Sequence, residues 1–264
     1  MLALTAVPIP AAAVPKADLW AIWLPSEKTS TQTVDHSAWQ RFLDSYVSPA
    51  ATGVNLVNYS AVTSADREAL NGYLASLAAL DPRGLNKDEQ LAYWINLYNA
   101  LTVEVVLRNP KKGSILRMGA GFLSIGPWDD KLFEVAGEPL TLNDIEHRII
   151  RPIWADHRIH YAVNCASIGC PNLSTTAYSG AAIDEQLAAA ERDYINHERG
   201  VRFTDRGKLQ LSSIFKWYRE DFARTEAELI AYLTGLHDTL AGELESYQRG
   251  VDYKYDWNLN RPPP

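Results

Sequence analysis

Hydrophobic residues recur at helical spacing along most of the chain, and they alternate strictly over only a few short stretches. The segment 87–108 is apolar nearly all round, a pattern typical of a helix buried at the centre of a domain. Residues 37–46 and 183–197 are amphipathic and predict helices that cover such a core. Capping sequences, in which an acidic residue follows the cap by three positions, support further helix starts at Thr63, Asn86 and Thr225.

Period-two alternation is confined to the second half of the chain. The segments 131–142 and 201–211 each contain a glycine-bearing turn and predict β-hairpins. Alternation over 158–163 predicts another strand, and we expect it to share one sheet with both hairpins. The pattern as a whole predicts an α+β fold, a helix-rich single domain with a small antiparallel sheet.

The chain has no internal repeats and no long linker, so residues 36–260 are expected to form one globular domain. Residues 1–35 are expected to be a flexible N-terminal segment. Its first residues are small, apolar and proline-rich but lack a basic region, which leaves a mobile tail and a trimmed signal peptide as equal alternatives. No apolar run is long enough to predict a transmembrane segment.

Composition and charge narrow the class of protein. The 264 residues are 47% hydrophobic and 22% charged, which is ordinary for a globular protein. The net charge of −7 disfavours a nucleic-acid partner, because an acidic surface repels phosphate. The two cysteines, Cys165 and Cys170, are too few for a disulfide scaffold, and their spacing is not that of a redox C-x-x-C motif.

Cys165 is the candidate nucleophile. It follows the predicted strand and begins a loop of small residues, whose free backbone N–H groups are expected to stabilise a thiolate and an oxyanion. A thiol nucleophile also needs a base, and we prefer His147 on the preceding predicted helix. His160 lies on the same predicted strand as the thiol, roughly 15 Å away. The simpler alternative is that Cys165 is a buried packing residue.

Two amides interrupt the apolar helix 87–108. Asn96 and Asn99 lie on one stripe of this helix, and buried amides require hydrogen-bond partners. We expect both to bond to the backbone of another segment, with the 160–172 loop as the expected partner. One of them is also a candidate to orient the imidazole of His147.

A metal site is a weaker hypothesis. The segment 156–170 contains His157, His160 and both cysteines, and such ligands suit zinc. Residues three apart on a strand point to opposite faces, however, and the spacing matches no zinc signature. The sequence therefore predicts neither a metal nor a cofactor.

Several motifs together resemble the family known as domain of unknown function 547, over roughly residues 36–260. The motifs are Tyr93-Trp-Ile-Asn-Leu-Tyr-Asn-Ala-Leu-Thr102, Glu146-His147 followed by Ile150-Arg151, His160-Tyr-Ala-Val-Asn-Cys165, Cys170-Pro171, Trp217-Tyr-Arg-Glu-Asp-Phe222 and Trp257-Asn-Leu-Asn260. The resemblance favours Cys165 and His147 over Cys170 and His160 as site residues. It also implies a periplasmic or secreted protein, since bacterial relatives are often exported. Some relatives are fused to glutaredoxin-like domains, which fits thiol chemistry, but no activity follows from membership. A distant papain- or transglutaminase-like fold is an extrapolation from the Cys–His pair.

Two functions from different classes remain open at this point. The first is thiol-dependent acyl transfer or hydrolysis of a peptide or a small amide or ester, with Cys165, His147 and Asn96 or Asn99 as the site. The second is a non-catalytic binding module in which Cys165 and Cys170 form a structural disulfide. The sequence does not fix the oligomeric state.

Overall fold

The computed structural model describes residues 15–121 and 124–263. Residues 1–14, on which the alternatives of a signal peptide and a mobile tail fall, lie outside the described residues. The fold is helix-rich α+β, as the sequence predicts. None of the described helices combines the length and apolar character needed to cross a membrane.

The helices and strands follow one another in three groups. The first contains η1 (Ala21–Trp23), α1 (Ser37–Tyr46), β1 (Val47–Pro49), β2 (Asn55–Val57), η2 (Tyr59–Ala61), α2 (Ser64–Ala78), η3 (Pro82–Gly84) and α3 (Lys87–Arg108). The second contains η4 (Ile115–Arg117), β3 (Phe133–Val135), β4 (Glu138–Leu140), η5 (Asp144–Ile150), α4 (Arg151–Trp154), α5 (Ile159–Ala162), η6 (Gly180–Ala182) and α6 (Ile183–Ile195). The third contains β5 (Val201–Phe203), β6 (Leu209–Ser212), α7 (Ile214–Trp217), α8 (Arg219–Phe222), α9 (Glu226–Leu236), α10 (Ala241–Glu245) and β7 (Asp252–Lys254).

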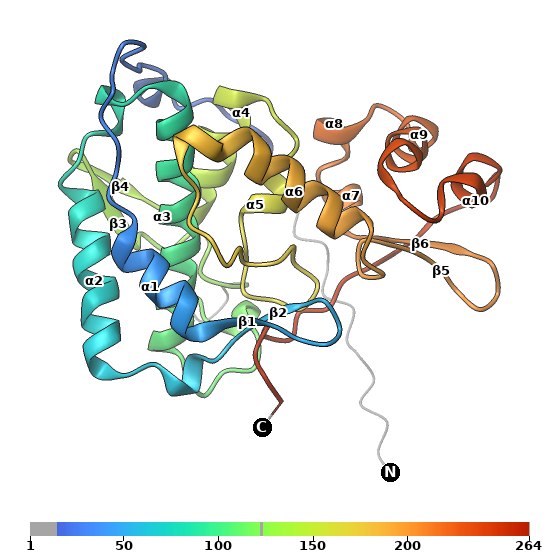
Figure 1. The fold of residues 1–264 in the computed structure, drawn as a ribbon, viewed down its shortest axis with the longest axis horizontal. Coiled ribbons are helices and arrows are strands. Elements are labelled where there is room, and N and C mark those ends of the chain that lie inside the picture. Colours follow the sequence, from blue (N-terminus) through green and yellow to red (C-terminus); the bar gives the residue numbers. More distant parts are fainter. Residues whose placement is uncertain (1–14, 122–123, 264) are drawn as a thin grey trace.

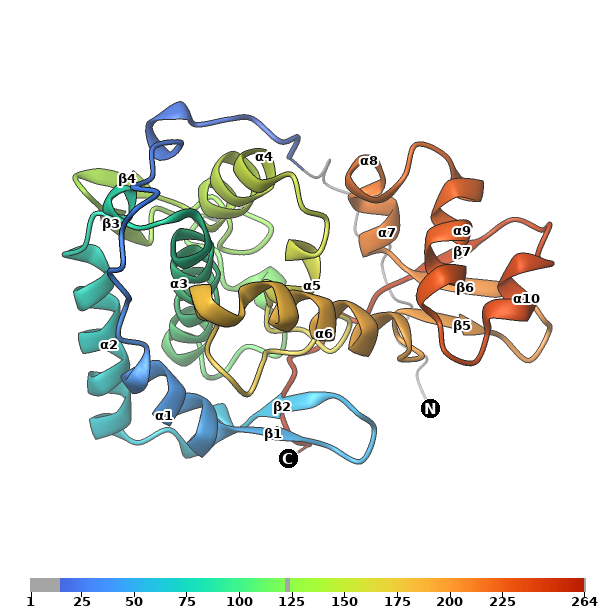
Figure 2. The same cartoon turned by 45° about the horizontal axis from the view of Figure 1, so that its top comes forward.

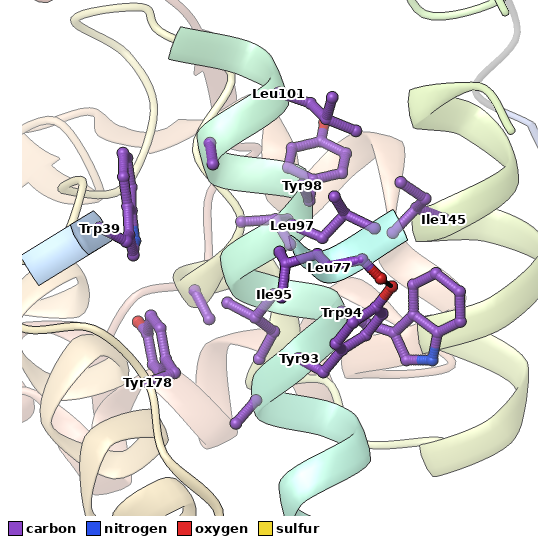
Figure 3. Close-up of a cluster of buried hydrophobic side chains, with 14 of the residues drawn as sticks. Trp39, Leu77, Tyr93, Trp94, Ile95, Leu97, Tyr98, Leu101, Ile145 and Tyr178 are labelled. Atoms are coloured by element: carbon purple, nitrogen blue, oxygen red, sulfur yellow. Dashed lines mark hydrogen bonds between the residues drawn. The ribbon is translucent and has the colours of Figure 1, made fainter. Parts of the chain in front are cut away.

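Helix α3 runs through the main hydrophobic core, with α1, α2, η5 and α6 around it (Figures 1 and 3). It begins at the predicted cap, where the side chain of Asn86 accepts a hydrogen bond from the N–H of Glu89. Nearly every side chain of α3 is buried, including Trp94 and Tyr98. The prediction of a central helix is therefore confirmed, and its burial fixes the position of every group that α3 carries.

The predicted hairpins are confirmed, but the predicted sheet is wrong. β3 pairs with β4 and β5 pairs with β6, each antiparallel, yet the two hairpins belong to separate sheets. The expected strand 158–163 is instead the short helix α5, in which every residue is buried. A segment that is buried on all sides has no polar face, so its alternation could not distinguish a strand from a helix.

A second hydrophobic cluster joins α6 to the C-terminal elements β5 to β7 and α7 to α10, which lie together on one side of the molecule (Figure 2). β7 pairs with β6 in parallel, and the chain then returns to the first cluster. There the backbone of Asn260 hydrogen-bonds to Ala166 and Val57. This returning segment, residues 255–260, passes directly over the loop that carries Cys165.

The described part of the N-terminal segment is packed against the domain. Trp23 is completely buried and its ring lies edge-on to Trp94, with the centroids 5.1 Å apart. The N–H groups of Asp18 and Trp20 bond to the carbonyl groups of His147 and Arg148. The first described residues of this segment therefore lie against η5, and Trp23 lies against α3.

Candidate functional site

The two amides of α3 hold two loops. Asn96 donates to the carbonyl of Tyr178 at 2.8 Å and accepts from its N–H at 3.0 Å. Asn99 donates to the carbonyl of Ala162 at 2.9 Å and accepts from the N–H of Asn164 at 2.8 Å. The prediction that both are buried and bonded to backbone is confirmed, and for Asn99 the partner is the expected segment. The oxygen and the nitrogen of each amide are both bonded to backbone groups. Each side chain therefore holds a loop in position.

The thiol of Cys165 lies among three polar groups. Its sulfur is 3.1 Å from the sulfur of Cys170, 3.1 Å from Ser167 Oγ and 3.1 Å from the hydroxyl of Tyr255. Both cysteines are free thiols; Cys165 is half-buried and Cys170 is buried. The N–H of Cys165 also donates to the sulfur of Cys170 at 3.0 Å. The loop therefore holds the two sulfurs in direct contact.

The Cys165 loop is closed by its own polar groups. The side chain of Asn164 donates to the carbonyl of Pro171 and accepts from the N–H of Ala166, so it bridges both ends of the loop. Ala166 has a φ of 57°, a left-handed conformation that is strained for a residue with a Cβ atom. Such strain persists only where the surrounding contacts enforce it, and it gathers at functional sites.

The expected oxyanion hole is not free. The N–H of Ala166 is bonded to Asn164, and those of Ile168 and Gly169 are bonded to the carbonyl groups of Asn258 and Asp256. The expectation of free N–H groups after Cys165 is therefore wrong for these positions. The cause is the returning segment 255–260, which pairs with the loop as a neighbouring strand would. A Cβ on Gly169 would lie 2.7 Å from the backbone nitrogen of Asp256, so only glycine permits this approach.

The two thiols have opposite acidities. The hydrogen bond with Cys170 lowers the pKa of Cys165 and outweighs burial, which raises it. Ser167 and Tyr255 lower the pKa further, whereas the negative charge of Glu146 opposes them. Burial raises the pKa of Cys170 well above its ordinary value. Cys165 is therefore the thiol that ionises first, and Cys170 remains a hydrogen-bond donor to it.

A buried cluster of charged groups lies beside this loop. Glu146 is 3.9 Å from His147 Nδ1 and 3.7 Å from His160 Nδ1. Arg151 lies against the carboxylate of Asp221, with Nε 2.7 Å from Oδ2. Burial acts to raise the pKa of Glu146, but the neighbouring His147, His160 and Arg151 bring it to about 2. The cluster therefore keeps a charged carboxylate inside the protein.

His147 comes from η5, a π-helical turn of the kind often found at functional sites. Its Nδ1 lies 3.1 Å from Nη1 of Arg151, and because a guanidinium only donates, Nδ1 accepts. Burial lowers the pKa of this imidazole, so the ring is neutral at pH 7 and carries its proton on Nε2. His147 lines a cavity of about 290 Å³ together with Lys16, Asp129 and Arg148.

His160 is held through its other ring nitrogen and by a carboxylate, whereas His147 is held by a guanidinium. Its Nε2 lies 2.6 Å from Oδ2 of Asp221, and its ring stacks on Tyr218 with the centroids 4.0 Å apart. The other ring nitrogen, Nδ1, is buried and has no hydrogen-bond partner among the described residues. The expected separation of roughly 15 Å from Cys165 assumed a strand, and the helical turn α5 shortens the path.

The structure brings the predicted site residues together only in part. Asn99 fixes the backbone that leads into Cys165, whereas neither asparagine bonds to His147. Among the described residues, no imidazole is hydrogen-bonded to the Cys165 sulfur. The sequence analysis missed Tyr255, which lies two residues before the Trp257–Asn260 motif, and Asp221, which lies within the Trp217–Phe222 motif. Nothing in the local sequence pattern assigned either residue a role.

In the described part of the chain, no group of three or more histidine, cysteine, aspartate or glutamate side chains could hold a metal ion. Of the histidines considered for zinc, His157 is bound to a carboxylate, with its Nε2 2.9 Å from Oε1 of Glu191. The side chain of His160 bonds to Asp221 instead. The two histidines considered for zinc in the sequence are thus engaged by separate carboxylates.

Comparison with known proteins gives one match. Residues 82–195, from η3 to the end of α6, match the model of the family described as "Protein of unknown function, DUF547". This segment, which is less than half of the chain, is similar to the DUF547 family. The resemblance noted in the sequence is thus confirmed over the part that contains Asn99, His147 and Cys165. No curated protein and no solved structure matches the chain.

Within the molecule, the matched segment 82–195 supplies the thiol, the two histidines and the two asparagines, whereas Tyr255 and Asp221 come from the chain that follows it. The site is therefore built by two parts of the sequence. The loop of the domain provides the sulfur, and the later elements provide the groups that surround it.

Proposed function

We propose that this protein is a cysteine-dependent hydrolase or acyltransferase that acts on an amide or ester. The observation that carries the proposal is the environment of Cys165, a half-buried thiol whose pKa is lowered by three hydrogen-bonding groups. A thiol that only filled space would need none of these polar neighbours. Perturbed acidity of this kind, combined with adjacent buried titratable groups, is characteristic of functional sites.

The reaction begins when the Cys165 thiol loses its proton to an imidazole. The thiolate attacks the carbonyl carbon of the substrate and forms a tetrahedral oxyanion. The imidazolium then returns the proton to the leaving amine or alcohol, which departs and leaves a thioester on Cys165. Water, or another acceptor with a free hydroxyl or amine, attacks the thioester and regenerates the thiol.

Two imidazoles are candidates for the base. His147 is the residue that the sequence predicts, but its Nδ1 accepts from Arg151, so its neutral ring presents an N–H to the cavity. His160 leaves Nδ1 without a hydrogen-bond partner among the described residues while Asp221 holds Nε2, the arrangement in which a carboxylate orients an imidazole. The hydrogen bonding therefore favours His160, and His147 is available as a donor to the substrate.

Hydroxyl groups take the place of the expected backbone oxyanion hole. Ser167 Oγ and the Tyr255 hydroxyl lie 3.0 Å from each other and equally close to the sulfur. An oxyanion formed on a carbonyl attached to Cys165 Sγ lies within reach of both. Donors that are already in position when charge develops stabilise a transition state without reorganisation.

The binding-module alternative is not favoured, since Cys165 and Cys170 are both free thiols. Acylation by 4-nitrophenyl butyrate tests the proposal directly. Release of 4-nitrophenol should show a burst, and mass spectrometry of digested protein should place the butyryl group on Cys165. Cys165→Ser should abolish the burst, whereas Cys170→Ala should reduce it because one hydrogen bond to the thiolate is lost. Absence of a butyryl adduct on Cys165 in protein with two titratable thiols would exclude the function.

A further inference from the structure

A second cavity opens beside the buried charge cluster, on the face formed by α7 and α8. Its volume is about 380 Å³. The lining residues are Lys16, Trp217, Arg219, Glu220, Ala223 and Arg224. It adjoins the cavity that contains His147, because Lys16 lines both.

This cavity is positively charged in a protein whose net charge is −7. Three cations line it against one carboxylate, and that carboxylate, Glu220, also lies 3.7 Å from Arg151. Among the described residues, no acidic side chain forms an ion pair with Lys16 or Arg224. The Nε of Arg219 is buried without a hydrogen-bond partner in the same part of the chain. Unpaired cations and an unsatisfied donor together indicate a place for an anion.

A short series of side chains links this cavity to the thiol. Trp217 forms part of the cavity wall, and its ring lies 4.8 Å from the ring of Tyr255. The hydroxyl of Tyr255 lies 3.1 Å from the Cys165 sulfur. A ligand seated against Trp217 is thus separated from the thiol by the width of these two rings.

We propose that this cavity binds a carboxylate carried by the acyl substrate of Cys165. The substrate class is then an amide or ester that bears a negative charge a few bonds from the carbonyl that reacts. Lys16 and Arg224 would bind the carboxylate, and the face of Trp217 would cover the apolar part of the chain. This inference rests on the proposed function, because it assigns the substrate to the same thiol.

Alkylation with a charged and a neutral reagent of the same shape tests the inference. Iodoacetate and iodoacetamide are compared at Cys165 in low salt, and the ratio of their rates is normalised to that of a free thiol such as glutathione. The cations should raise the normalised ratio above one. Lys16→Gln and Arg224→Gln should each lower it about threefold, as expected for one unit charge acting over several ångströms.

Further measurements distinguish the carboxylate-binding cavity from the nucleophilic role of Cys165. Arg41→Gln changes the same charge on the exposed surface of α1 and should leave the ratio unchanged. Salt at 1 M should remove the preference for iodoacetate, because the screening length falls to about 3 Å. If iodoacetamide labels Cys165 rapidly but the ratio is the same in wild type, Lys16→Gln and Arg224→Gln, the carboxylate site is excluded and the nucleophile stands. If neither reagent labels Cys165, both proposals fail.

A pair of matched esters extends the test to turnover. 4-Nitrophenyl hydrogen succinate and 4-nitrophenyl butyrate have acyl chains of equal length and differ in one carboxylate. The succinate ester should have the higher kcat/KM, and Arg224→Gln should reduce this advantage through KM. Equal kcat/KM for both esters in the wild-type protein would overturn the inference.

Discussion

The hydroxyl of Tyr255 lies 3.1 Å from the sulfur of Cys165, although 90 residues separate the two in the sequence. The contact exists because the returning segment 255–260 is bonded to the Cys165 loop through the backbone of Ile168 and Gly169. An aromatic hydroxyl at this distance stabilises a thiolate by donating a hydrogen bond to it. The acidity of the thiol therefore depends on a residue outside the segment 82–195 that matches the family.

Tyr255→Phe should slow alkylation of Cys165 by iodoacetamide at pH 7. Removal of one hydrogen bond to a charged sulfur costs about 1.5–3 kcal/mol, which corresponds to roughly a tenfold or larger fall in the thiolate population. The measurement is the rate of modification at Cys165 as a function of pH. Tyr253→Phe is the matched control, because its hydroxyl contacts Arg219 and Glu226 instead. Identical pH profiles for both variants would show that Tyr255 has no part in the acidity.

Asn96→Leu and Asn99→Leu should each destabilise the fold. Each change leaves one backbone N–H and one carbonyl buried without partners, at about 1–3 kcal/mol for each group. Urea denaturation measures the loss. Only Asn99→Leu should also alter the alkylation rate of Cys165, since its partners Ala162 and Asn164 lead into that residue. A stable Asn96→Leu variant would contradict the role of its buried hydrogen bonds.

The identity of the base can be decided by chemical rescue. His160→Ala should lower the acylation rate by about 100-fold or more, as expected on removal of a general base. Added imidazole should restore part of the rate, which a merely structural residue would not allow. His147→Ala should retain more activity, with a weaker dependence on added imidazole. The reverse result, rescue of His147→Ala alone, would return the role to the residue that the sequence predicts.

The free energy of unfolding should fall in two separate pH ranges as the solution is acidified. Burial lowers the pKa of His36 and His147 in the folded protein, so the unfolded chain binds their protons first. The free energy of unfolding should therefore fall as the pH drops below about 6.5, the ordinary histidine value. It should fall again below about pH 4.5, as the unfolded chain protonates carboxylates such as Glu146 whose folded pKa is about 2.

Glu146→Gln tests the contribution of this carboxylate to the fall in stability at the lower pH. The variant should be less stable at pH 7, because Arg151 loses a buried counter-charge. Its stability should also depend less on pH between about 4.5 and 2. Glu245→Gln, a change at an exposed carboxylate, serves as the control. Parallel pH curves for wild type and Glu146→Gln would contradict the lowered pKa of Glu146.

The helical framework was accessible from the sequence because its signals are local. Asn86 caps α3 and Thr225 forms a capping box with Glu228, and each needs only residues within one turn. The buried amides Asn96 and Asn99 were equally recognisable, since a polar group on an apolar helix must find a partner.

The arrangement of the site was not accessible in the same way. The segment around Tyr161 is buried on every side, so its pattern suited a strand as well as the helix that it forms. Tyr255 and Asp221 reach the site through tertiary contacts, which no local spacing encodes. The closed oxyanion position followed from the pairing of the Cys165 loop with residues 256–260, a contact between distant segments.

The return of residues 255–260 over the Cys165 loop also sets an order of events during synthesis. Helices α1, α2 and α3 are close in sequence, so they can pack against one another while the later chain is still being synthesised. The thiol acquires its tyrosine partner only after the segment around Tyr255 has left the ribosome and has docked. Until then the nascent chain lacks the hydrogen bond from Tyr255, one of the three that lower the pKa of Cys165.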